Sequence, residues 1–268
     1  GPPLLAAALA LALLFGARLA YYGTWLPNSY WAKGADAWHL AAGLAWLGAF
    51  VQSAWQVIPL AGLAAFGALA GREPGLRRLC LASLLCAGAY ALYVAKVGGD
   101  FMHFRFAWPP YLVLAFGGLA GLVELARRGV PAAAAVAFGV GALAFSPPVH
   151  EHEYAMQTLP EMDAYTRLGR EVGPLLGRVL PPDTVIATTL AGTIAYYSKL
   201  EVVDQWGLND RAVARGAPLE HFQRGHYKPA TTEYLTERGV ALAFGHPDVV
   251  ACSAPRSEGH PVALVRLE

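Results

Sequence analysis

Charged side chains are scarce in this chain. They make up 15% of its 268 residues, whereas soluble domains usually contain about 25%. The shortage lies in residues 1–146, which hold only thirteen charged side chains, and the other twenty-six lie in residues 147–268. This contrast excludes one continuous soluble domain and predicts an apolar membrane part followed by a soluble part.

Several other signals are missing. The formal net charge is only +1, which argues against nucleic acid as a partner because such proteins need a concentrated basic face. The three cysteines show no disulfide framework, since Cys80 and Cys86 share one apolar run and Cys252 stands alone. The sequence also has no phosphate-binding glycine loop, no nucleophile elbow and no His-Glu-x-x-His motif. The soluble enzyme classes that depend on these motifs are therefore excluded.

Long apolar runs fill the first half instead. A helix needs about 20 largely apolar residues to cross a bilayer. Five crossings are expected, at roughly Leu4–Ala20, within Trp38–Ala70, and at Leu79–Val97, Phe106–Ala126 and Val130–Phe145. The fold class predicted for residues 1–146 is a polytopic α-helical membrane module with about five spans.

The region Trp38–Ala70 is too long for one straight helix. Its first part, Trp38–Trp55, carries aromatic and polar side chains that suit the headgroup level of a bilayer. We expect an interfacial or re-entrant helix there, followed by a true span that Pro59 kinks.

Arginines in two short loops predict the orientation. One loop contains Arg72, Arg77 and Arg78, and the other contains Arg127 and Arg128. Positively charged loops tend to face the cytoplasm. Alternation then places the loop 21–35, the hairpin 98–105 and everything after residue 146 on the outer side.

Residues 147–268 alternate between helical and extended patterns. Apolar residues recur at helical spacing across Met162–Val179, and Thr184–Ala187 has the composition of a buried strand. Further helices are expected over 192–197 and 232–238, and further strands over 201–204, 240–244 and 261–267. Strands that alternate with helices predict a small extracytoplasmic α/β domain.

The hairpin Gly98–Arg105 places Asp100, His103 and Arg105 between two apolar runs. Charge in such a position is costly unless it has a function. In the functional interpretation, Arg105 and His103 bind a phosphate, because a guanidinium donates two parallel hydrogen bonds, and Asp100 orients a hydroxyl or a metal. The alternative is an Asp100–Arg105 ion pair that merely holds the hairpin closed.

Three other clusters combine polar and aromatic residues. Tyr21–Lys33 suits a sugar or lipid-phosphate surface, or an aromatic belt with a snorkelling lysine. Asp204–Arg211 follows a predicted strand, where ligand sites often lie, but a turn capped by Asn209 and Asp210 is equally compatible. Gly225–Pro229 is either part of a membrane-facing site or a polar loop. His150–Glu153 invites a metal interpretation, although a solvated turn after the last span explains it better.

The four clusters together resemble one family. Their order is Tyr-Tyr-Gly-x-Trp-x-Pro-Asn-Ser-Tyr-x-Ala-Lys (Tyr21–Lys33), Gly-Gly-Asp-Phe-Met-His-x-Arg (Gly98–Arg105), Asp-x-x-Gly-Leu-Asn-Asp (Asp204–Asp210) and Gly-His-x-Lys-Pro (Gly225–Pro229). This order is similar to that of bacterial GT-C glycosyltransferases, and most of all to the terminal β-1,2-arabinofuranosyltransferases of mycobacterial cell walls.

The resemblance implies a multi-pass enzyme of the bacterial plasma membrane. Such an enzyme moves a sugar, here arabinofuranose or another pentose, from a polyprenyl-phosphate donor to a cell-envelope glycan on the outer face. The donor phosphate would contact Arg105, His103 and Lys33. The sugar and acceptor would contact Tyr22, Trp25, Asn28, Asp204, Asn209, Asp210, His226 and Lys228.

One departure from the family concerns the catalytic base. These enzymes carry acidic catalytic residues in the first outer loop, and this chain is expected to begin beyond that loop. Asp100 is therefore the candidate catalytic residue within the chain. No cofactor is implied with certainty, and a requirement for a divalent cation is left open because the family varies in it.

Two other functions stay open. The chain could be a non-catalytic glycan-binding or assembly subunit of the cell envelope. It could also transport or ligate lipid-linked glycans, but a transporter should carry polar residues deep in several spans, and these spans consist mostly of Ala, Leu, Val and Gly.

Overall fold

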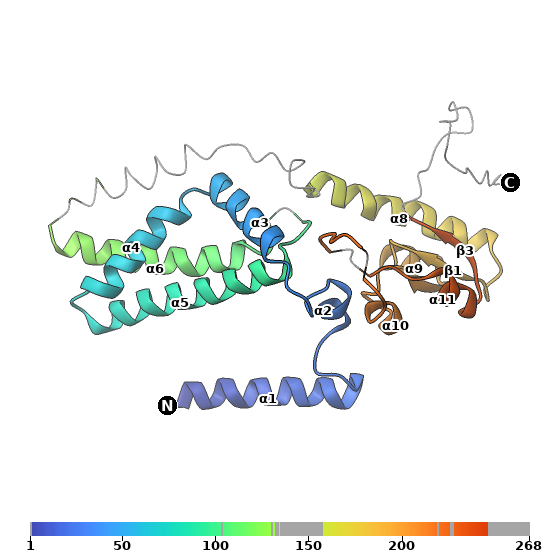
Figure 1. Ribbon diagram of the computed structural model, residues 1–268, viewed down its shortest axis with the longest axis horizontal. Helices are drawn as coiled ribbons and strands as arrows, with labels where there is room; N and C mark the ends of the chain where they lie inside the picture. The colour runs from blue at the N-terminus through green and yellow to red at the C-terminus, as the bar shows by residue number, and fades with distance from the viewer. Residues whose placement is uncertain are drawn as a thin grey trace, which may run out of the picture. The chain divides into compact units, whose positions relative to one another are not determined.

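The computed structural model describes residues 2–102, 104–129, 131, 134, 158–218, 220–225 and 228–245 (Figure 1). The chain forms two compact units. The first comprises Gly1–Leu159 with Trp206–Pro229, and the second comprises Pro160–Gln205 with Ala230–Glu268. The sequence predicts a boundary at residue 146, whereas in the structure the segment 206–229 packs with the N-terminal unit.

The first unit is helical. Its helices are α1 (Pro2–Tyr22), α2 (Asn28–Ala32), α3 (Leu40–Ser53), α4 (Val57–Ala70), α5 (Pro74–Val97), α6 (Trp108–Arg127) and α10 (Arg211–Ala214). Three of these, α1, α5 and α6, are long and apolar enough to cross a membrane, and the bent pair α3–α4 raises the number to at most four among the described residues. These helices indicate membrane association. The expected fifth span, 130–145, lies outside the described residues.

The predicted break within residues 38–70 is present, but its position differs. Helices α3 and α4 meet at 93°, and the break falls at residues 54–56. Pro59 instead lies in the first turn of α4, where a missing backbone N–H removes no bond within the helix. The prediction that Pro59 kinks the span is therefore wrong, and Pro59 belongs to the start of a new helix.

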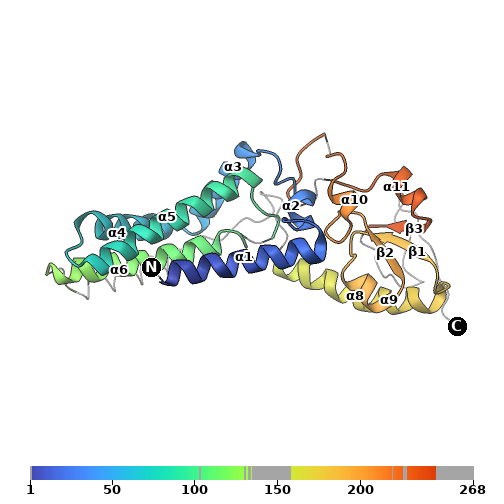
Figure 2. The same ribbon diagram turned by 90° about the horizontal axis from the view of Figure 1, so that it is seen from below.

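Helices α4, α5 and α6 pack closely because small residues line their contacts (Figures 1 and 2). A side chain at Gly121 of α6 would overlap the carbonyl group of Leu63 on α4, and one at Gly117 would collide with Ser83 on α5. Small residues let helix backbones approach each other, which is how helices commonly associate in membranes.

Replacing Gly121 with Ala is expected to destabilise the first unit by about 1–3 kcal/mol, because the new methyl group must push α6 away from the α4 backbone. Gly88 on α5 is a matched control, since no described atom lies within 4 Å of a methyl group added there. Gly88→Ala should leave stability unchanged or raise it, because Ala favours helix over Gly. Thermal unfolding of both variants in the same detergent makes the comparison, and equal melting temperatures would contradict it.

The second unit is a small α/β layer. It contains α8 (Leu159–Val179), β1 (Val185–Thr188), α9 (Thr193–Ser198), β2 (Glu201–Asp204), α11 (Thr232–Glu237) and β3 (Val240–Phe244). The three strands are parallel in the order β2-β1-β3. Their core is made by Ile186, Ile194 and Leu200 with neighbours on α8. The predicted α/β class is confirmed for these elements, and the expected strand 261–267 lies outside the described residues.

Candidate functional site

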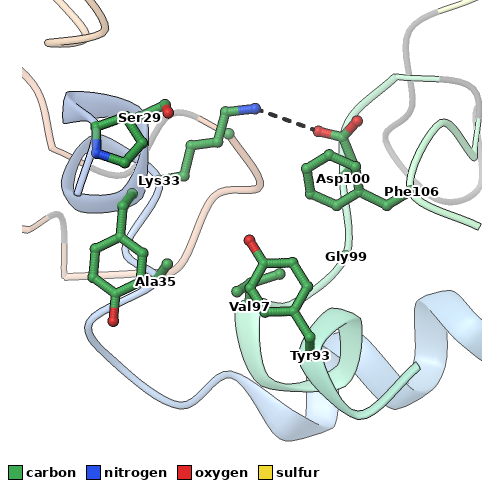
Figure 3. A pocket seen from close by; sticks show the side chains of 11 residues that line it. Ser29, Lys33, Ala35, Tyr93, Val97, Gly99, Asp100 and Phe106 are labelled. Carbon is green, nitrogen blue, oxygen red and sulfur yellow. Dashed lines mark ion pairs between the residues drawn. The ribbon is translucent and has the colours of Figure 1, made fainter. Parts of the chain in front are cut away.

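A cavity of about 410 Å³ lies where the loop after α1 meets the end of α5 (Figure 3). Its walls come from α2 and the residues around it, from the last turn of α5, and from the hairpin between α5 and α6. The lining residues are Pro27, Ser29, Tyr30, Lys33, Ala35, Tyr93, Val97, Gly99, Asp100, Phe106 and Gly225. All of them belong to the first unit.

Two glycines turn the chain into this cavity. Helix α5 ends at Gly98 with φ +84°, and Gly99 follows with φ +86°, a conformation that costs other residues energy. A side chain on Gly99 would also collide with Trp46. The fully buried Trp46 ring instead donates a hydrogen bond from Nε1 to the Asp100 carbonyl oxygen at 2.8 Å. This contact fixes the position of Asp100 at the start of the hairpin.

Asp100 is the centre of a buried charge cluster. Its side chain is 1% exposed, and Lys33 Nζ lies 3.7 Å from Oδ1. Arg105 Nη2 donates to Oδ1 at 3.0 Å and lies 2.8 Å from Oδ2. Within the described part of the chain, Oδ2 accepts no well-directed hydrogen bond. The ion pair of the structural interpretation is thus present, yet the Arg105 side chain remains 46% exposed and keeps donors available.

Lys33 lies deeper than Arg105. Its ammonium group is 5.5 Å from the ring centres of both Phe101 and Phe106, and Figure 3 shows it directed toward Asp100. Burial lowers the pKa of Lys33 below its ordinary value, and the Asp100 carboxylate opposes part of that shift. Lys33 and Arg105 both pair with the Asp100 carboxylate. One positive charge of the cluster is thus left unbalanced.

The residues of the predicted sugar wall do not line the described cavity. Tyr22 and Trp25 are 60% and 55% exposed, and neither they nor Asn28 is among the described lining residues. Ser29 and Tyr30 line the cavity instead, together with Lys33 from the same short helical segment. Ser29 and Lys33 are four positions apart, a spacing that places both side chains on one face of a helix. That spacing is the sequence signal that could have identified them as cavity residues.

The segment 206–229 contributes Gly225, from the predicted cluster Gly225–Pro229, to the cavity lining and adds two residues, Phe222 and Arg224, that were not predicted. Gly225 lines the cavity and packs against Phe101. Arg224 donates to the carbonyl oxygens of Gly98 at 2.9 Å and Ala42 at 3.3 Å. The Phe222 ring stacks on His39 with centroids 3.9 Å apart. No sequence signal pairs these residues, because their partners lie more than 120 positions away.

The remaining predicted site residues are dispersed. Lys228 lies in the first unit, where its ammonium group pairs with Asp36 at 2.9 Å. Asp204 ends β2 in the second unit and is 3% exposed. Asn209 is exposed and, like Asp204 and Lys228, is not among the lining residues of the described cavity. His103 and His226 lie outside the described residues.

Asp210 has a local structural role. Its Oδ1 accepts hydrogen bonds from the backbone N–H groups of Ala212 at 2.9 Å and Val213 at 3.1 Å, so Asp210 caps helix α10. The capped turn, one of the two interpretations of this cluster, is therefore present.

Replacing Asp210 with Ala should lower the free energy of unfolding by about 1 kcal/mol, the usual effect of losing a cap. Asp210→Asn should keep nearly the full free energy of unfolding, because Asn is also a strong N-cap residue. Chemical unfolding of the two variants measures the difference. If the Asn variant lost as much stability as the Ala variant, the charge rather than the cap would be responsible.

The described ranges contain no group of three or more His, Cys, Asp or Glu side chains placed to hold a metal ion. The motif His150–Glu153 lies outside these ranges. The chemistry available in the cavity is that of one carboxylate, one lysine ammonium group and an aromatic wall, and Arg105 adds a second cation from outside the lining.

Comparison with known proteins gives one similarity. A family model described as a domain of unknown function (DUF8728) matches residues 153–262, which is less than half of the chain. No curated protein and no solved structure matches the chain. The match covers most of the second unit and the segment 206–229, and it leaves Lys33 and Asp100 outside the family model.

Proposed function

We propose that the chain is a membrane glycosyltransferase of the GT-C type. It would take a sugar, such as arabinofuranose or another pentose, from a polyprenyl-phosphate donor and transfer it to a cell-envelope glycan. The observation that carries the proposal is the Lys33–Asp100 pair in a cavity at the end of a candidate membrane span, with Arg105 bound to the same carboxylate.

The charge of the cluster suits the proposed donor. A sugar joined to a polyprenyl chain through one phosphate is a phosphodiester with a single negative charge. The cluster has one positive charge more than its carboxylate balances. Arg105 offers a half-exposed guanidinium, whose planar fork matches two phosphate oxygens, and Lys33 adds a point charge.

The remaining walls suit a sugar ring. Phe106 and Tyr93 present apolar faces to the cavity, and Ser29 and Tyr30 bring hydroxyl groups. Aromatic rings cover the apolar face of a sugar, whereas hydroxyl groups exchange hydrogen bonds with its polar rim. This combination is what a site for the pentosyl group of the donor requires.

Asp100 is the candidate general base in this mechanism. An acceptor hydroxyl must lose its proton as it attacks the anomeric carbon of the donor, and the leaving phosphate must be stabilised at the same time. Oδ2 of Asp100 is buried and accepts no well-directed hydrogen bond from any described residue. Asp100 lines the cavity, so its carboxylate would accept that proton once Arg105, which lies 2.8 Å from Oδ2, turns with Lys33 to the departing phosphate.

The proposed location is the bacterial plasma membrane, with the cavity at the outer face. The two arginine-containing segments lie at the opposite end of α5 from the cavity, since α5 begins at Pro74 and ends beside Gly98. Such segments tend to stay in the cytoplasm, which supports an outward-facing cavity and an extracytoplasmic second unit.

A transfer assay with the full chain in liposomes tests the proposal. The chain is incubated with a polyprenyl-phosphoryl [14C]pentose and an envelope-glycan acceptor, and radiolabel in the glycan is counted. We expect time-dependent transfer. Saturable glycan binding with no transfer would instead support the non-catalytic subunit, and absence of both transfer and donor binding would refute the proposal.

A further inference from the structure

An arginine rim lies at the end of the α4–α5–α6 bundle that is remote from the Asp100 cavity. It consists of Arg72, Arg77 and Arg78, around the start of α5, and Arg127 and Arg128, at the end of α6. Figures 1 and 2 both show these two segments at the same end of the bundle. An ion pair of 2.7 Å between Arg127 and Glu73 joins them.

Part of the rim is fixed by the protein itself. Arg77 Nε donates to the carbonyl oxygen of Ala68 at 2.9 Å, and Arg128 donates to the carbonyl oxygen of Ala70 and to Glu124. The last carbonyl groups of a helix have no partner within it. These arginines therefore satisfy the end of α4, and their positions are set before any ligand binds.

The other part of the rim carries uncompensated charge. Arg72 and Arg78 are exposed, and neither has an ion pair or a hydrogen bond in the part of the chain that the structure describes. Within the described ranges, the five guanidinium groups pair with two carboxylates, those of Glu73 and the buried Glu124. Arg77 and Arg78 also lie in the early turns of α5, where the helix dipole disfavours cations. The rim therefore presents a positive potential that the protein does not balance.

We propose that the arginine rim binds the headgroup of an anionic phospholipid in the surrounding leaflet. A lipid phosphodiester supplies the negative charge, and its oxygens match the guanidinium donors. Two exposed leucines flank the rim, Leu69 at 82% and Leu79 at 46%. Apolar side chains beside exposed arginines suit acyl chains beside a headgroup, so a lipid fits this surface better than free phosphate does. The inference rests on α5 and α6 crossing a bilayer and is independent of sugar transfer.

Native mass spectrometry of the full chain in mild detergent tests this inference. Phosphatidylglycerol and phosphatidylcholine with identical acyl chains are added as probes, and their bound adducts are counted. We expect a preference for phosphatidylglycerol that falls about fivefold for each arginine removed in Arg72→Gln and Arg78→Gln. The control variant Arg170→Gln with Arg178→Gln removes the same charge from exposed positions on α8 and should keep the preference.

Two results would overturn the inference. One is an unchanged preference for phosphatidylglycerol in the Arg72→Gln/Arg78→Gln variant, or an equal loss of that preference in the Arg170→Gln/Arg178→Gln control. The other is displacement of the lipid by an equal concentration of glycerol phosphate, which would mean that the rim recognises a soluble phosphate. Because Arg72 and Arg78 are exposed and make no hydrogen bond or ion pair with the described residues, loss of folding is not expected to confuse the comparison.

Discussion

Replacing Asp100 with Asn is expected to reduce sugar transfer by about 10²–10⁴-fold, the usual contribution of a general base. The amide has nearly the same shape as the carboxylate, so the Trp46 contact with the main chain of residue 100 should persist. Lys33 and Arg105 would face a neutral group instead of an anion. Donor binding should therefore be unchanged or tighter, because a charge that competes with the phosphate has been removed.

The split between binding and turnover is what makes this prediction specific. Transfer rates and donor affinity are measured on the full chain in liposomes, with Asp183→Asn as a control at an exposed turn of the second unit. Turnover of the Asp100→Asn variant within about twofold of the original chain would leave the carboxylate with only the structural role of closing the hairpin.

Replacing Arg105 with Ala is expected to lower transfer by about 10²–10³-fold, which is typical when one donor to a developing negative charge is lost. Here the loss should appear in donor affinity as well as in turnover, since the guanidinium is proposed to contact the phosphate before and during the reaction. Arg105→Lys should recover part of the loss, because it restores the charge without the planar fork.

The control for this prediction is Arg170→Ala, which removes an exposed arginine from α8 of the second unit. Circular dichroism and gel filtration report whether each variant is folded. If Arg105→Ala kept its donor affinity, the guanidinium would serve only as the partner of Asp100, and the proposed phosphate site would have to lie elsewhere.

Much of the fold could be predicted from local patterns. The helix 162–179 and the strands near 185, 202 and 242 follow from apolar spacing and from breakers such as Pro181 and Pro182, and the structure has each of them. The break between α3 and α4 shows the limit of this reasoning. Proline is the usual cause of a kink, but the turn falls before Pro59, where proline starts a helix more readily than it bends one.

Part of the candidate site could also be predicted from local sequence patterns. Asp100, Arg105 and Lys33 are conspicuous because charge beside apolar runs is costly, and the structure brings all three together. Gly225 belongs to a cluster that the sequence singles out, but its partner, like Phe222 and Arg224 with theirs, was not predictable. Their contacts with Phe101, His39 and Gly98 join segments that are far apart in sequence, and no local pattern encodes such pairing.

Photo-crosslinking tests the central claim most directly. A polyprenyl phosphate with a diazirine next to the phosphate is bound to the full chain, irradiated, and the labelled peptides are identified by mass spectrometry. Crosslinks should concentrate on peptides that contain Lys33 or Phe106, and unlabelled polyprenyl phosphate should remove them. Labels confined to the exposed faces of α1 and α5, with the residues around Lys33 unmodified, would contradict a lipid-phosphate site beside Asp100.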